Sequence, residues 1–184
     1  MKIVIILSAI REERKSQNLA KFLLKKMNER VSTELIDLKK INLPIFGTQP
    51  ESHENIEIVR DILIKSDGII FISPEYHQTY TSTLKNMVEY YLVEFTKKPI
   101  GVATTSAGKF GGVQASIHLQ SLVLALGAYP IPTRLLIPEI QNAFNAKNEP
   151  ANADIEKNID YFIDEFLDFA TALYRDKRNK RVIS

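Results

Sequence analysis

The stretch Ile69-Ile-Phe-Ile-Ser-Pro-Glu-Tyr-His-Gln-Thr-Tyr-Thr-Ser-Thr-Leu-Lys-Asn86 decides the class of fold. It begins with an uninterrupted apolar run, which is typical of a strand covered on both faces of a parallel sheet. A polar loop follows, and from Ser82 onward Leu84, Val88 and Tyr91 recur at helical spacing. A buried strand, a polar loop and an amphipathic helix in this order indicate an α/β domain with a mainly parallel sheet.

The same alternation runs along the rest of the chain. Strands are expected at Ile3–Leu7, Glu34–Leu38, Ile69–Ser73, Ile100–Thr105 and Tyr129–Ile137. Helices are expected at Ser16–Arg30, Asn55–Lys65, Ser82–Phe95, Gly112–Leu126 and Asn152–Tyr174. The polar second strand and the proline-containing last strand suit the sheet edges, because proline cannot donate to a strand ladder. Right-handed crossovers leave few topologies, and ligands of such sheets bind beyond the carboxyl ends of the strands.

Composition excludes several classes of function. The chain has 184 residues, of which 45% are hydrophobic and 25% charged, as in a single globular domain. It has no cysteine, which excludes disulfides, thiolate metal sites and a cysteine nucleophile. The three histidines, His53, His77 and His118, are far apart in the sequence. Any metal site would have to be mostly carboxylate, and we predict none.

The net charge of +2 is unevenly distributed. Residues 175–184 hold five basic side chains and one acidic one, which leaves 19 basic and 21 acidic side chains elsewhere. A nucleic-acid-binding protein carries basic charge on its folded surface, so we expect no nucleic-acid partner. We predict a domain over residues 1–174 and a disordered basic tail over residues 175–184. Contact of this tail with RNA or anionic lipid is the alternative.

No part of the sequence suggests a membrane. No run approaches the roughly 18 apolar residues that a spanning helix needs. The apolar run Ile3–Leu7 is followed by the charged segment Arg11–Lys15 and by no small-residue cleavage site. It is therefore interpreted as a buried strand and not as a signal peptide. With no cysteine and no signal, we expect a cytoplasmic location and no membrane partner.

The first strand-end loop, Ser8–Asn18, leads into a helix. A helix start offers free N–H groups and partial positive charge, which suit a phosphate. Arg11 can add a guanidinium, and Ser16 a hydroxyl that caps the helix and donates to an oxyanion. The alternative is that Ser16 only caps and the charges are solvated. The loop lacks glycine and matches neither the dinucleotide nor the P-loop fingerprint.

Two more loops follow buried strands. One carries Tyr76, His77 and Tyr80 within five residues, just after Pro74, which fixes the backbone. This composition suits a flat ring with a polar edge; the alternative is a loop packed on itself or on a neighbouring subunit. The other, Thr104–Gly112, has three successive hydroxyl residues and then three glycines within five positions, which let the backbone approach a ligand closely. A generic mobile connection is the alternative there.

In these loops the sequence resembles the NAD(P)H-dependent FMN reductase family of flavodoxin-like proteins, which includes quinone, azo and chromate reductases. Pro74-Glu-Tyr-His77 and Leu84-Lys-Asn86 are similar to the family's Pro-Glu-Tyr-Asn and Leu-Lys-Asn. The segments Ser106–Gly112 and Leu126-Gly-Ala128 match as well, and the resemblance extends to about Tyr174. Two departures concern the site. Ser8-Ala9 stands where the family has Gly-Ser or Gly-Thr, which removes one phosphate-binding hydroxyl, and His77 stands where Asn is commoner.

The resemblance implies a three-layer flavodoxin-like sandwich with a five-stranded parallel sheet in the order 2-1-3-4-5. It implies hydride transfer from NADPH or NADH to bound FMN and then reduction of a quinone, azo compound, chromate or free flavin. The cofactor carries this chemistry, so no catalytic side chain is named. A non-catalytic FMN electron carrier and a flavin-free interaction module are the alternatives. The acceptor and the choice between NADPH and NADH stay open.

The resemblance also implies which residues hold FMN. The phosphate would be held by Arg11, Ser16, Gln17 and Asn18. The ring would be contacted on one side by Pro74, Glu75, Tyr76 and His77, and on its other edge by Thr105, Ser106 and Gly108. Glu75 is expected to brace its loop and not to act as an acid.

A homo-oligomer is also predicted. The helix Ser82–Phe95 carries Met87, Tyr90 and Val93 beside an apolar stripe that already faces the core, and the helix Gly112–Leu126 has a similar excess. A helix that is apolar over more than one stripe needs a second partner. We expect a homodimer or a dimer of dimers with its interface near the flavin. Cover by the C-terminal helix is the alternative.

Overall fold

The computed structural model describes residues 1–48 and 53–183, with side chains up to residue 174. Its strands are β1 (Lys2–Leu7), β2 (Ser32–Asp37), β3 (Gly68–Pro74), β4 (Pro99–Thr105) and β5 (Tyr129–Ile137). Its helices are α1 (Ser16–Asn28), α2 (Leu38–Ile41), α3 (Glu54–Ile64), α4 (Ser82–Tyr90), α5 (Val113–Ala125) and α6 (Ala153–Ile183).

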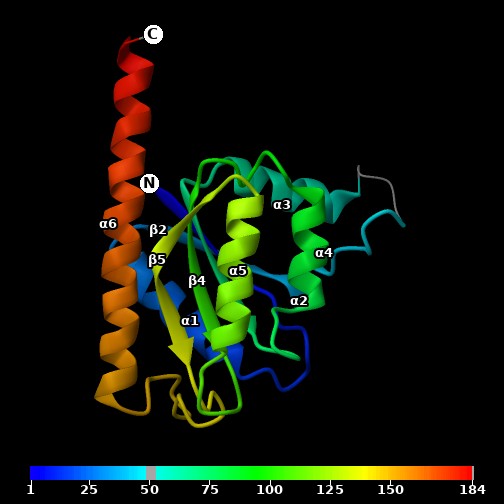
Figure 1. Cartoon of the computed structure of the whole chain (residues 1–184), viewed down its shortest axis with the longest axis vertical. Coiled ribbons are helices and arrows are strands. Elements are labelled where there is room, and N and C mark those ends of the chain that lie inside the picture. Colours follow the sequence, from blue (N-terminus) through cyan, green and yellow to red (C-terminus); the bar gives the residue numbers. More distant parts are fainter. Residues whose placement is uncertain (49–52, 184) are drawn as a thin grey trace.

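The five strands form one sheet in the order β2-β1-β3-β4-β5, and all neighbouring strands run parallel. The sheet lies between two layers of helices, with α1 and α6 on one face and α3, α4 and α5 on the other (Figure 1). The predicted three-layer fold and strand order are therefore confirmed, and β2 and β5 lie at the edges as expected.

Residues of the central strands alternate between two cores. On β1, Ile3, Ile5 and Leu7 pack with α1 and α6, whereas Val4 and Ile6 pack with α3 and α4. None of these five side chains is more than 1% exposed. Because both faces of the strand are covered, every position needs an apolar residue, which explains the uninterrupted run in the sequence.

The end of β2 differs from the prediction. The strand ends at Asp37, and a short helix, α2, begins at once. The carboxylate of Asp37 accepts a hydrogen bond from the N–H of Lys39 at 3.1 Å and caps this helix. An aspartate that bonds to the backbone two residues on favours a turn over a continued strand. The predicted strand through Leu38 therefore stops one residue early.

The helix predicted for Ser82–Phe95 ends at Tyr90. The chain then turns inward, because Tyr91 and Phe95 are fully buried and the Tyr91 hydroxyl donates to the carbonyl of Ile56 at 3.0 Å. Burial raises the pKa of Tyr91, which keeps this hydroxyl a donor. Leu92, which falls inside the range predicted for this helix, lies beyond the end of α4 and is 64% exposed.

The last helix is longer than predicted. It continues to Ile183 instead of ending at Tyr174. Residues 175–183 contain no proline or glycine that would stop a helix. The division into a domain over residues 1–174 and a tail over residues 175–184 stays a prediction. Within the described part of the chain, no helix combines the length and the apolar character that a membrane span requires.

The α6 helix packs its aromatic rings against the only glycine of β4. Phe162 and Phe166 lie stacked, with ring centroids 6.4 Å apart. A Cβ atom built on Gly101 would come within 2.9 Å of Phe162 Cζ and 3.0 Å of Phe166 Cδ2. Gly101 thus lets the long helix approach the sheet.

We expect Gly101→Ala to lower the free energy of unfolding by about 1–3 kcal/mol, the usual cost of overpacking a filled core. The melting temperature falls by about 2–4 °C for each kcal/mol in a chain of this size. Gly108→Ala is the matched control, because a Cβ atom there meets nothing within 4 Å. Equal melting temperatures for Gly101→Ala and the unchanged protein would contradict this packing.

Candidate functional site

The carboxyl ends of β1, β3 and β4 meet at one edge of the sheet, and the three predicted loops enclose a cavity of about 480 Å³ there. Its border includes seven of the predicted site residues: Arg11, Ser16, Pro74, Glu75, Tyr76, Thr105 and Ser106. The other four, Gln17, Asn18, His77 and Gly108, do not border it. Sequence reasoning missed six further border residues: Glu13, Arg14, Lys15, Ala107, Ile140 and Gln141.

Ser16 is the first residue of α1 and not its cap. The cap position belongs to Lys15, whose side chain makes no capping bond within the described structure. The Ser16 hydroxyl is buried and has no hydrogen-bond partner among the described residues. The expectation that Ser16 caps the helix is therefore wrong, because the cap position lies one residue earlier.

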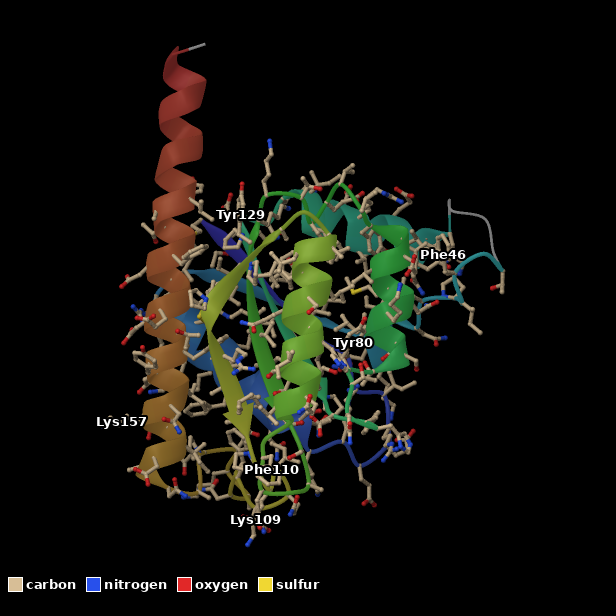
Figure 2. The ribbon with its side chains drawn as sticks, viewed as in Figure 1. Phe46, Tyr80, Lys109, Phe110, Tyr129 and Lys157 are labelled. Carbon is tan, nitrogen blue, oxygen red and sulfur yellow. The ribbon has the colours of Figure 1, made fainter. Side chains whose placement is uncertain are left out.

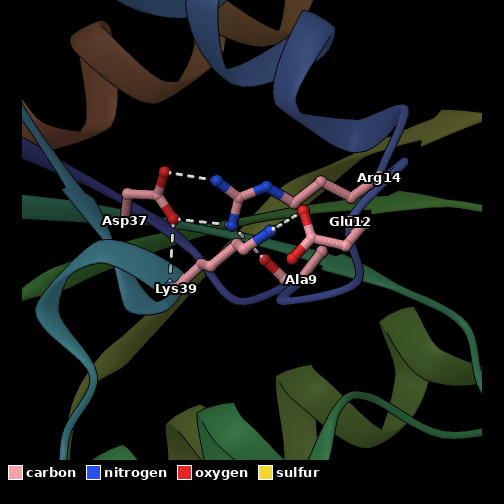
Figure 3. Close-up of polar contacts among 5 residues, drawn as sticks. All are labelled: Ala9, Glu12, Arg14, Asp37 and Lys39. Carbon is pink, nitrogen blue, oxygen red and sulfur yellow. Dashed lines mark hydrogen bonds and ion pairs between the residues drawn. The ribbon is translucent and has the colours of Figure 1, made fainter.

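The two arginines of the first loop lie in opposite environments. Arg11 is exposed, and its Cζ atom lies 4.2 Å from the ring centroid of Tyr76, a cation–π contact across the cavity border. Arg14 is buried, and its guanidinium pairs with Asp37 (Figure 3). The sequence held no local signal for this pair, because it depends on the strand pairing that places Asp37, at the end of β2, opposite Leu7.

Ala9 does not border the cavity. Its side chain is 1% exposed and packs in the core with α1. Its carbonyl accepts a hydrogen bond from Arg14 Nη1 at 2.5 Å. In this chain the position that departs from the family pattern therefore contributes to the core and to the shape of the loop.

The loop after β3 is a tight hairpin tied to its neighbours. Tyr76 and Thr79 bond to each other through both backbone groups, and His77 and Gln78 between them have positive φ. The N–H of Glu75 donates to the carbonyl of Thr105 at 2.8 Å. The Glu75 carboxylate accepts from the N–H of Ala115, in the first turn of α5, at 2.9 Å. Glu75 is thus a brace, as the sequence predicts.

The tip of this hairpin borders a second, more open cavity of about 430 Å³. It is formed by the hairpin residues Tyr76, His77 and Tyr80 and by the start of α4. Burial raises the pKa of Tyr80 above its usual value, so its hydroxyl stays neutral. His77 is exposed here, outside the three-loop cavity.

The loop after β4 combines a fixed base with an exposed tip. The Thr105 hydroxyl is buried and has no partner among the described residues, whereas that of Ser106 donates to the carbonyl of Gly108. At its far end, a Cβ atom on Gly112, where φ is +83°, would lie 2.9 Å from Thr104 Cβ. Figure 2 shows the tip residues Lys109 and Phe110 projecting from the fold; Phe110 is 80% exposed.

A third cavity, of about 650 Å³, lies on the other side of the first loop. Ile10, Leu43 and Ile45 provide apolar walls, and the start of α4 closes it with Ser82 and Thr83. Together the three cavities follow the carboxyl edge of the sheet. In the described residues, no three His, Asp or Glu side chains come together as a metal site would require.

Comparison with known proteins identifies the family to which the chain belongs. The model of the NADPH-dependent FMN reductases matches residues 1–142. The chain belongs to this family. An NADPH azoreductase from Bacillus sp. (strain OY1-2) is 28% identical over 141 residues, which span 74% of this chain and 76% of that protein. An FMN-dependent NADPH-azoreductase from Staphylococcus aureus is 26% identical over 182 residues, or 92% of this chain and 95% of that protein.

Solved structures show the same fold at lower identity. The FerB flavoenzyme NAD(P)H:(acceptor) oxidoreductase from Paracoccus denitrificans superposes with a TM-score of 0.81 at 22% identity, over 93% of this chain and 97% of that one. A flavodoxin from the domain Archaea superposes with a TM-score of 0.61 at 13% identity, over 95% and 99%. The fold is therefore flavodoxin-like, and the chain is a member of a family of FMN-dependent NAD(P)H oxidoreductases.

Proposed function

We propose that the chain binds FMN in the three-loop cavity and uses NAD(P)H to reduce a small aromatic acceptor. One observation carries the proposal. The buried hydroxyls of Ser16 and Thr105 have no partner among the described residues, and both border the same cavity as Arg11. A buried polar group left unpaired costs about 1–3 kcal/mol, so a ligand that bonds to both hydroxyls offsets that cost.

The α1 end of the cavity fits the phosphate. Ser16 donates from its hydroxyl, and Arg11 moves from the Tyr76 ring to form a charge-assisted contact. Gln17 contributes its backbone N–H at the positive end of the helix dipole. The N–H of Asn18 already donates to the Lys15 carbonyl, so Asn18 contributes its side-chain amide.

The other end of the cavity receives the ring. Pro74, Glu75 and Tyr76 border the cavity and cover one side of the ring, whereas His77, at the exposed tip of the hairpin, contacts it only from outside the cavity. The N–H groups of Glu75, Tyr76 and Ser106 are taken by carbonyls of the fold. The donors for the polar edge are therefore the Thr105 hydroxyl and the N–H groups of Ala107 and Gly108, with the Ser106 backbone alongside. When bound, FMN accepts a hydride from NAD(P)H and passes two electrons on, while the protein orients the reactants.

The acceptor is proposed to be an azo compound or a quinone. Support comes from the apolar walls of the 650 Å³ cavity beside the first loop, which suit a flat aromatic molecule better than chromate. The names of the two azoreductase relatives favour NADPH as donor. Chromate and free flavin are the alternative acceptors. The absence of cysteine supports a cytoplasmic location.

Flavin loading and turnover test this proposal. Denaturing the purified, FMN-reconstituted protein is expected to release FMN, and the loaded protein is expected to oxidise NADPH faster with an azo dye or quinone than with chromate. A protein that binds FMN but turns over NADPH only slowly is an electron carrier. A protein that binds no FMN at micromolar concentration is an interaction module, and either result overturns the proposal.

Arg11→Ala is expected to weaken FMN binding by about one to two decades. A charge-assisted hydrogen bond contributes about 1.5–3 kcal/mol, which corresponds to that range. Fluorescence titration of the apoprotein measures the change. Arg30→Ala, which removes an exposed arginine paired with Asp164, is the control and keeps full affinity. Unchanged affinity in Arg11→Ala would refute the phosphate assignment.

We also propose that the chain forms a homodimer, and that the dimer can pair again. The helices α4 and α5 are neighbours on one face of the sheet (Figure 1). Exposed apolar residues belong to both segments: Leu92 and Val93 follow α4, and Ile117 and Leu124 belong to α5. Contiguous exposed apolar surface is typical of an interface. Met87 and Tyr90, expected to extend this surface, are instead buried within the chain itself, because α3 and the 44–46 segment cover them.

Val93→Asp combined with Leu124→Asp is expected to convert the dimer to a monomer, since each places a charge in an apolar interface. Light scattering at micromolar concentration measures the mass. Tyr161→Asp is the control, because Tyr161 is also an exposed large apolar residue but lies on α6. A monomeric unchanged protein with full FMN binding and turnover would contradict the proposal.

A further inference from the structure

Arg11 and Arg14 lie together in the first loop, at the α1 end of the three-loop cavity, where the phosphate is proposed to bind. Resting on the proposed FMN site, we propose that the buried Arg14–Asp37 ion pair is a positioning device. It holds the first loop in the phosphate-binding shape before FMN arrives, whereas Arg11 contacts the phosphate itself.

The pair is bidentate and buried. Arg14 Nη1 donates to Asp37 Oδ1 at 2.7 Å, and Nη2 donates to Oδ2 at 2.6 Å (Figure 3). Arg14 is 9% exposed and Asp37 is 8% exposed. Two parallel hydrogen bonds fix the guanidinium plane as well as its distance, which a single contact does not do.

The same guanidinium closes the loop on itself. Nη1 also donates to the carbonyl of Ala9 at 2.5 Å, so the side chain of Arg14 joins the start of the loop to its end. Ser16, whose hydroxyl has no partner among the described residues, follows only two residues later. The position of the α1 start relative to β1 therefore depends on this contact.

Asp37 anchors the other end of the device. It is the last residue of β2, opposite Leu7 in the parallel register, and its Oδ1 also caps α2 through the N–H of Lys39. The loop is thus attached to the rigid sheet and not to another loop. A loop that is ordered without its ligand loses less conformational entropy when the ligand binds.

Because Asp37 neutralises the charge of Arg14, Arg14 does not bind the phosphate directly. The two opposite charges lie within hydrogen-bond distance, so the pair presents no net charge to a phosphate. A buried pair is weak evidence for stability, because apolar residues of similar volume often serve as well. The best-supported role of a buried ion pair is to select one conformation, and here that is the conformation of the first loop.

A second ion pair joins the same segments but lies in solvent. Glu12 and Lys39 are 2.7 Å apart, and Lys39 lowers the pKa of Glu12. The Glu12 side chain is 89% exposed, so water and salt screen the pair. Glu12→Gln is therefore a matched control within the same loop.

The test variant is Arg14→Met with Asp37→Asn. It removes both charges together, so no unpaired charge is left buried. Asparagine keeps an oxygen that can cap α2, because it is as good a cap as aspartate. Methionine fills the space of the arginine stem but cannot bond to Ala9 or to residue 37. The variant thus removes the tie and keeps the packing.

Two measurements follow on the apoprotein. Amide hydrogen exchange of residues 9–16 is expected to become at least about tenfold faster in the double variant. The affinity for FMN is expected to fall about tenfold, because binding must then also order roughly one more residue of the loop. The dependence of FMN affinity on salt should match that of the unchanged protein, because no net charge is removed. Arg11→Ala should reduce that dependence.

Glu12→Gln should leave exchange and affinity unchanged. Arg60→Met with Glu94→Gln removes a partly buried ion pair away from the site in the same way, and should keep FMN affinity even if the melting temperature changes. If this second control also loses affinity, general destabilisation explains the effect and the inference fails.

Three other results overturn the inference. Unchanged loop exchange or unchanged FMN affinity in the double variant means that the pair does not position the loop. A reduced salt dependence like that of Arg11→Ala means that Arg14 binds the phosphate directly. Absence of FMN binding by the unchanged protein instead refutes the proposed function, and loop exchange then still decides whether the pair holds the loop.

Discussion

Burial of the parallel sheet on both faces is the constraint on which the rest of this structure depends. A parallel strand can follow its neighbour only through a crossover, and the helices that make the crossovers cover both faces of the sheet. All strands then end at one edge, and loops far apart in the sequence meet there. The cavity between residues 11–16, 74–76 and 105–106 is a consequence of this geometry before any side chain is considered.

At this edge of the sheet, contacts made by side chains fix the conformation of the loops that contain no glycine. The first loop has no glycine, and it is shaped by the buried guanidinium of Arg14 between Ala9 and Asp37. The hairpin after β3 keeps two successive non-glycine residues at positive φ, a conformation that persists only where surrounding contacts enforce it. Its own paired backbone bonds and the Glu75 brace to α5 supply those contacts.

The polar groups at the site fall into two sets, those that bond within the protein and those that find no partner among the described residues. Glu75, Ser106 and Arg14 bond to the protein itself. The hydroxyls of Ser16 and Thr105 do not bond to the described residues, although both are buried. Because folding leaves few buried polar groups unpaired, and because these two hydroxyls border the same cavity, we propose that a ligand completes their hydrogen bonding.

The sequence by itself determined the α/β class, the strand order implied by the family resemblance, and the three loops that form the cavity. It could do so because strands buried on both faces need apolar residues at every position, a local and visible pattern. Only the tertiary structure decided that α4 stops at Tyr90, that Ser16 does not cap α1, and that Arg14 is buried while Arg11 is exposed. These depend on partners distant in sequence: Ile56 accepts from Tyr91, and Asp37 meets Arg14 across 23 positions. Helical spacing and loop composition do not reveal such contacts. A charged side chain can be buried only where another residue neutralises it, and that residue lies elsewhere in the sequence.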